Sequence, residues 1–124
     1  MGFLRNRIKA FGYAFSGLGY ILRTQKNVVI YGVIMLAVIL AGILLSISTL
    51  EWLLLFFAIG LVWSAEVFNT SIETVVDLVQ PENHPLAKIA KDTAAAGVLV
   101  TAITASVIGV YILVVPILRL IFAK

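Results

Sequence analysis

The 124-residue sequence contains no cysteine, only one histidine and few charged residues. Without cysteine the chain can form neither disulfides nor thiolate metal sites, and one histidine excludes zinc sites built on two or more histidines. A GxxxxGK[ST] phosphate loop is also absent, so any nucleotide chemistry must proceed without one. Charged residues make up 12% of the chain, about half the fraction of a typical soluble domain.

What the chain has in excess is hydrophobic residues, at 62% of the total, with a mean hydropathy of +1.13. This composition is typical of an integral membrane protein. The formal net charge is +3, and the basic residues gather at the flanks of the apolar segments. That distribution indicates membrane topology and argues against nucleic-acid binding.

Three apolar segments are long enough to cross a bilayer as helices, and we expect an all-α membrane protein. They cover about residues 28–48, 52–79 and 86–115, the last followed by a tail to residue 124. Twenty-one residues of helix span about 31 Å, which is enough for the hydrocarbon core. We therefore predict one membrane domain over residues 1–124.

Residues 1–25 form an N-terminal arm that is unsuited to spanning the membrane, because four basic residues interrupt it. Its apolar residues recur at helical spacing on one side. We predict an amphipathic helix that lies in the headgroup region.

Lysine and arginine are distributed unevenly among the connecting segments. Five lie between residues 5 and 26, two lie between residues 80 and 92, and the 46–51 turn has none. The positive-inside rule places the N-terminus and the 80–92 loop in the cytoplasm and the C-terminus outside. Arg119 and Lys124 oppose this orientation but are outnumbered.

Four polar residues form a stripe on the second apolar segment: Glu66, Asn69, Glu73 and Asp77. At about 100° per residue they share one helix face over roughly 16 Å of axis. Ionisable groups inside a membrane helix are costly unless they have partners or a function. The predicted topology places this stripe in the cytoplasmic half of the membrane, where nucleotide is available.

Each residue of the stripe has a chemical role and a structural alternative. Glu66, the deepest, suits a general base, although interhelical hydrogen bonding would also explain it. Glu73 suits a hard oxygen ligand for Mg²⁺ carrying phosphates, or the partner of a cytoplasmic base. Asn69 could orient Glu66, donate to a phosphate oxygen or pack between helices. For Asp77 we favour an ordinary solvated acid.

Lys91 and Asp92 open the membrane part of the third segment. Lys91 could neutralise a phosphate, while Asp92 could bind metal, position a ligand or pair with a base. Positive-inside anchoring and compensation of the helix dipole are the simpler alternatives. Residues 94–97 are all small, which lets a neighbouring helix or a lipid tail approach closely.

An acid-lined, base-flanked site with apolar walls fits Mg²⁺-dependent phosphoryl transfer to a lipid alcohol. Proton or cation translocation could use the same stripe. However, no acids or bases continue the stripe through the first segment or the outer half of the third. A non-catalytic scaffold or transport subunit is the alternative from another functional class.

The residues from Glu66 to Asp77 follow the pattern E-x-x-N-[ST]-[SA]-I-E-x-x-[VI]-D, and Ala90-Lys91-Asp92 with small residues follows after a loop. This arrangement resembles the signature of the small prokaryotic diacylglycerol kinases over nearly the whole chain. Residues 23–27 and 84–88 look more like the undecaprenol kinase branch. The resemblance implies a homotrimer in the bacterial plasma membrane, with active sites between subunits. It further implies phosphate transfer from MgATP to the hydroxyl of undecaprenol or, alternatively, of diacylglycerol.

The resemblance also implies roles for individual residues. Glu66 matches the general base and a lipid contact, and Glu73 matches the carboxylate that binds metal and nucleotide. Asn69 and Ala95 fall at substrate-binding positions. The remaining nucleotide-binding positions are Tyr13, Glu82, His84, Lys91 and Asp92.

Gln25 departs from the family pattern, which usually has a glutamate of the metal site at this position. An amide can coordinate Mg²⁺ through its carbonyl but contributes no charge. We therefore predict that Gln25→Glu lowers the Mg²⁺ concentration needed for half-maximal activity, measured by titrating Mg²⁺ at fixed ATP. An unchanged Mg²⁺ requirement would contradict a metal-binding role for this position.

Overall fold

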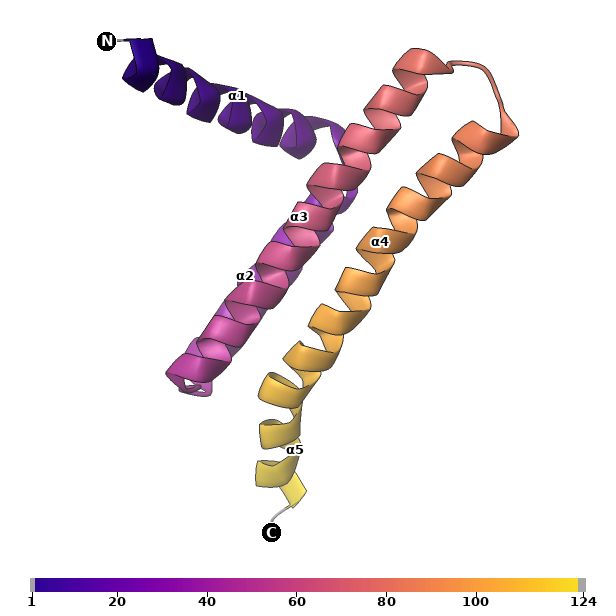
Figure 1. Ribbon diagram of the computed structural model, residues 1–124. Coiled ribbons are helices and arrows are strands. Elements are labelled where there is room, and N and C mark those ends of the chain that lie inside the picture. The colour runs from indigo at the N-terminus through magenta and orange to yellow at the C-terminus, as the bar shows by residue number, and fades with distance from the viewer. Residues whose placement is uncertain (1, 123–124) are drawn as a thin grey trace. The chain divides into compact units, whose positions relative to one another are not determined.

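The computed structural model describes residues 2–122, and every regular element within that range is helical (Figure 1). The elements are α1 (Gly2–Thr24), α2 (Asn27–Leu44), α3 (Thr49–Val79), α4 (Pro85–Gly109), a π-helical turn η1 (Val110–Val114) and α5 (Val115–Phe122). Three stretches are long and apolar enough to cross a membrane: Asn27–Leu44, Thr49–Val79 and Pro85–Arg119. The expected all-helical architecture with three candidate spanning helices is thus confirmed.

Inter-residue contacts divide the chain into two compact units, Met1–Val33 and Ile34–Lys124. In the first unit, the predicted arm is helical throughout α1. The helix ends with Thr24, whose hydroxyl donates to the carbonyl of Tyr20 at 2.9 Å, and α2 begins three residues later at Asn27. The interfacial location of α1 stays a prediction.

The second unit begins within α2, and a tight turn joins α2 to α3. Ser46 adopts a positive φ of 50°, its N–H donates to the carbonyl of Ile43, and the N–H of Ile47 donates to Gly42. These bonds form a Schellman motif, which ends α2 at Leu44. Two residues after Ser46, the Ser48 side chain and Glu51 form a capping box that starts α3 at Thr49. The predicted first segment extended to residue 48 because hydropathy does not detect this stop signal.

A small hydrophobic core lies near this turn. Leu55 of α3 packs with Ile112 and Leu113 of η1, and partly buried apolar residues of α2, the turn and α4 surround them. Gly42 lets the Trp52 ring of α3 lie close to α2, because an added Cβ would lie only 2.8 Å from that ring. The Trp52 ring is in turn stacked on Phe56, with centroids 5.6 Å apart.

Helices α3 and α4 run side by side in opposite directions, joined by the loop of residues 80–84 (Figure 1). With 31 residues, α3 is about 46 Å long, longer than the roughly 30 Å hydrocarbon core. Its last turn is closed by the Gln80 N–H, which donates to Val76 at 2.8 Å. His84 caps α4 by accepting a hydrogen bond from the Leu86 N–H. Pro85 occupies the first turn of α4, where a backbone N–H would have no acceptor within the helix, so its missing N–H costs nothing. The loop end of this hairpin carries a cluster of charged side chains: Asp77, Glu82, Lys88, Lys91 and Asp92.

Pro116 does not end the third apolar segment, although a tail was expected after residue 115. The π-helical turn precedes it, and the Val115 N–H donates to Val110, five residues back. Proline cannot donate to the carbonyl four residues earlier, and the wider π turn accommodates this change. The helix therefore continues as α5 to Phe122.

We predict that Gly42→Ala destabilises the packing of α2 on α3 by about 1–3 kcal/mol, because the new methyl group overpacks against Trp52. The measurement is thermal or denaturant unfolding in a fixed detergent. Gly60→Ala is the matched control, since its Cβ would meet nothing within 4 Å.

A double-mutant cycle assigns the effect to the ring. In a Trp52→Ala background, Gly42→Ala should lose most of its penalty. A penalty of the same size in both backgrounds would exclude the Trp52 contact as its cause.

Candidate active site

The polar stripe of α3 passes from a buried to an exposed environment along the helix. Glu66 is 2% exposed and Asn69 is 7% exposed, whereas Glu73 is half-buried and Asp77 is exposed. The helical conformation is continuous through all four residues, as the sequence predicted. The stripe therefore combines a deep carboxylate with charges near the loop end of the hairpin.

Asn69 and Glu73 are joined by a hydrogen bond. The Asn69 side-chain N–H donates to a Glu73 carboxylate oxygen at 3.1 Å, as expected for residues one turn apart on a helix. Asn69 thus orients Glu73, a role that sequence reasoning did not assign. The other side-chain atom of Asn69, Oδ1, is buried and has no hydrogen-bond partner among residues 2–122.

Two ion pairs lie at the loop end of the hairpin. Lys91 on α4 pairs with Asp77 on α3, and Lys88 pairs with Asp92 one turn along α4. The first pair connects the two helices across the hairpin. Asp77, expected to be an ordinary solvated acid, is exposed but is the partner of Lys91.

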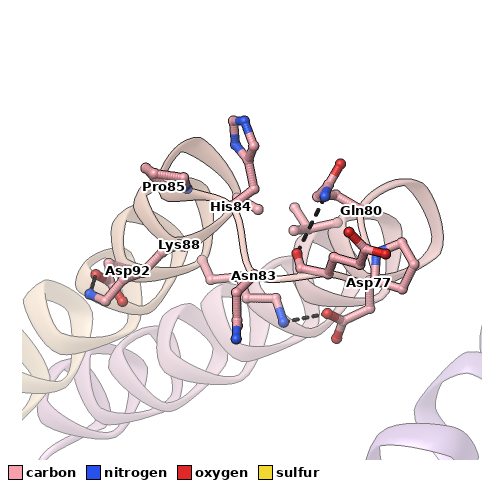
Figure 2. Close-up of a pocket in the computed structure, with 12 residues that line it drawn as sticks. Asp77, Gln80, Asn83, His84, Pro85, Lys88 and Asp92 are labelled. Carbon is pink, nitrogen blue, oxygen red and sulfur yellow. Dashed lines mark hydrogen bonds and ion pairs between the residues drawn. The ribbon is translucent and has the colours of Figure 1, made fainter.

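A pocket of about 690 Å³ opens at this end of the hairpin (Figure 2). Its size lies within the range of small-molecule sites in proteins. Figure 2 shows Asp77 on one side, Lys88 and Asp92 on the other, and Asn83 and His84 pointing in opposite directions from the loop. The polar lining residues are Asp77, Gln80, Glu82, Asn83, His84, Lys88, Lys91 and Asp92.

The pocket brings together four of the predicted nucleotide-binding residues. These are Glu82, His84, Lys91 and Asp92. Sequence reasoning missed Asp77 and Lys88 as members of this cluster. The spacing of Lys88, one helical turn before Asp92, could have predicted their ion pair. No motif, however, distinguished Lys88 from a lysine that anchors the loop at the membrane surface.

The other predicted site residues lie outside this pocket. Glu66, Asn69 and Glu73 occupy deeper turns of α3, and Ala95 is exposed on α4, one turn beyond Asp92. Tyr13, on α1, and Gln25, between α1 and α2, belong to the first unit, Met1–Val33. Contacts within the second unit therefore bring together only some of the predicted site residues, namely those that line the pocket.

The stripe offers oxygen donors that fit Mg²⁺. No group of three or more His, Cys, Asp and Glu residues that could hold a metal occurs within residues 2–122. Mg²⁺ in kinases is commonly bound by only one or two carboxylates together with substrate phosphates. The half-buried Glu73 carboxylate, oriented by Asn69, is a donor of this type.

The chain is similar to known proteins over most of its length. The sequence profile of the family described as prokaryotic diacylglycerol kinase matches residues 12–113. An undecaprenol kinase of Bacillus subtilis is 39% identical over 109 residues, which cover 88% of this chain and 89% of that protein.

Two proteins named diacylglycerol kinase are also similar. The protein of Synechocystis is 40% identical over 116 residues, covering 93% of this chain and 66% of its own length. That of Escherichia coli K12 is 34% identical over 98 residues, covering 79% of this chain and 80% of its own length. The chain belongs to the prokaryotic diacylglycerol kinase family, a family of lipid kinases.

Proposed function

We propose that this protein transfers the γ-phosphate of ATP to the hydroxyl of undecaprenol at the cytoplasmic surface of the bacterial plasma membrane. The observation that carries the proposal is the gradient along α3. A carboxylate that is 2% exposed lies in the apolar part of the helix, and a charged pocket opens at its end. A lipid hydroxyl would approach from the apolar side and a nucleotide from the aqueous side. The change from apolar to charged surroundings along α3 therefore suits both substrates.

Glu66 is the proposed general base. Its carboxylate takes the proton of the lipid hydroxyl while the hydroxyl oxygen attacks the γ-phosphorus of ATP. The new oxygen–phosphorus bond forms as the bond to the β-phosphate oxygen breaks, and ADP leaves. Since phosphoryl transfer depends mainly on positioning and charge neutralisation, an apolar, water-poor setting for Glu66 favours the reaction.

Glu73 is the proposed ligand for Mg²⁺, with Gln25 as a second, neutral ligand. Asn69 supports this role by holding a Glu73 oxygen at 3.1 Å. When bound, Mg²⁺ neutralises charge on the phosphates. Glu73 lies two turns from Glu66, about 10 Å along the axis, which separates the metal from the proton acceptor.

The loop-end pocket is the proposed nucleotide site, with Glu82, His84, Lys91 and Asp92 in its lining and Tyr13 of α1 as a further contact. The N-terminus of α4 supports this assignment, because helix N-termini favour anionic phosphates. We infer that phosphate replaces Asp77 as the partner of Lys91. Surface ion pairs contribute only about 0–1 kcal/mol, so this exchange is energetically accessible.

Undecaprenol is the favoured lipid because the Bacillus subtilis relative, which this chain matches over 89% of its length, is named for it. Diacylglycerol is the alternative, because the Synechocystis and Escherichia coli relatives carry that name. Ala95, in the small-residue patch of α4, leaves room for a lipid chain close to the helix backbone.

The proposed assembly is a homotrimer with a cytoplasmic N-terminus and an external C-terminus. The orientation rests on the lysine and arginine distribution, and α1 would lie in the headgroup region. A trimer is supported by the half-buried Glu73, because packing between subunits would shield the stripe from lipid.

The test offers labelled ATP to the purified trimer in lipid, with undecaprenol and diacylglycerol in parallel. We expect a higher kcat/KM for undecaprenol. Glu66→Gln should lower kcat by about 10²–10⁴-fold while ATP affinity stays unchanged, because only the base is lost. Glu73→Gln should weaken ATP binding as well. No transfer to either lipid by a folded trimer would defeat the kinase function, and near-normal turnover by Glu66→Gln would defeat the base assignment.

A second prediction concerns Lys91. Replacing it by Met should raise the KM for ATP by about 10- to 100-fold, the range expected for losing a hydrogen bond to a charged group. The matched control, Asp77→Asn, removes the same ion pair but leaves the cation, so the KM for ATP should stay constant or fall slightly. A KM for ATP that Lys91→Met does not change would rule out the phosphate contact.

A further inference from the structure

Several hydroxyl side chains of α3 and α4 follow a common bonding pattern. On α3, Ser71 and Thr74 donate to the carbonyl four residues earlier, each at 2.8 Å. Three residues of α4 do the same at 2.8–2.9 Å: Thr93, Thr104 and Ser106. This local bond is the usual way for a hydroxyl to be satisfied inside an apolar helix.

Thr70 does not follow this pattern, although it is the most buried hydroxyl on α3. It is 4% exposed, and its Oγ1 has no hydrogen-bond partner among residues 2–122. A buried hydroxyl without a partner costs about 1–3 kcal/mol. The adjacent Asn69 Oδ1 is also buried and has no hydrogen-bond partner within the described residues. Two neighbouring unpartnered groups indicate a place where something else supplies the hydrogen bonds.

Thr70 lies next to the reacting groups. It follows Glu66 by four residues on the same continuous helix, so both side chains share one face with Cβ atoms about 5–6 Å apart. Both residues are more than nine-tenths buried. A hydroxyl that gives its proton to Glu66 would therefore be within reach of the Thr70 hydroxyl.

We propose that Thr70 binds the hydroxyl oxygen of the lipid alcohol and positions it for attack, an inference that rests on the proposed kinase function. The Thr70 hydroxyl donates to one lone pair of the lipid oxygen. The second lone pair attacks the γ-phosphorus, and the lipid proton passes to Glu66. Thr70 keeps its own proton throughout, so it orients the substrate and takes no part in proton transfer.

The experiment compares wild type with Thr70→Val, which keeps the shape and removes the hydroxyl, and with Thr70→Ser, which restores it. Thr74→Val is the control, because the Thr74 hydroxyl is satisfied by its own helix. We expect Thr70→Val to raise the KM for lipid and lower kcat/KM for lipid by roughly 3- to 10-fold, with the KM for ATP unchanged. Thr70→Ser should keep most of the activity, and Thr74→Val should match wild type.

Stability separates this role from a structural one. Removing an unpartnered buried hydroxyl should leave the melting temperature unchanged or raise it, so activity and stability should not fall together. If Thr70→Val lowers the melting temperature and the trimer population in parallel with activity, Thr70 bonds a neighbouring subunit and the proposal is overturned. An unchanged kcat/KM for lipid in Thr70→Val also overturns it. In that case the proposed kinase function still stands if the wild type is active. If the wild type is inactive, both the kinase function and the role of Thr70 are overturned.

Discussion

In the hydrocarbon region of a bilayer there is no water to satisfy a polar group, so every carboxylate, amide or hydroxyl there needs a partner. Most polar groups on these helices meet this requirement locally. Hydroxyls bond to their own helix, Asn69 bonds to Glu73, and Ser48 with Glu51 caps the start of α3. The exceptions stand out for that reason: the unpartnered atoms of Asn69 and Thr70 lie together beside the deepest carboxylate.

Because α3 is longer than the hydrocarbon core is thick, its polar residues lie in different environments along the helix. A 31-residue helix exceeds the hydrocarbon thickness, so the same face carries an apolar part around Glu66 and a charged part near Asp77. The loop then returns α4 alongside, so that Lys91 meets Asp77. The hairpin therefore provides a buried carboxylate and, at its loop end, an open charged pocket, which are the two environments that the proposed function requires.

The opposite end of the hairpin is held together by apolar contacts and by motifs at the helix ends. The Schellman motif at Ser46, the capping box and the Gly42–Trp52 approach hold α2 against α3, and the π turn before Pro116 brings Ile112 and Leu113 onto Leu55. Part of this could be predicted from sequence, since the Ser48–Glu51 spacing is a capping box. The continuation of the helix through Pro116 could not, because proline usually ends a helix unless the hydrogen-bond ladder shifts around it.

The sequence by itself determined the membrane class, the number of apolar helices and the shared face of Glu66, Asn69, Glu73 and Asp77, because hydropathy and helical periodicity are local properties. The tertiary structure alone decided that Asp77 pairs with Lys91, fourteen residues away, because that contact depends on how the loop returns α4 beside α3. It also decided which polar atoms stay without a partner. Periodicity places Thr70 near the stripe, but only the packed structure shows that it is buried and unsatisfied, since burial depends on neighbouring helices.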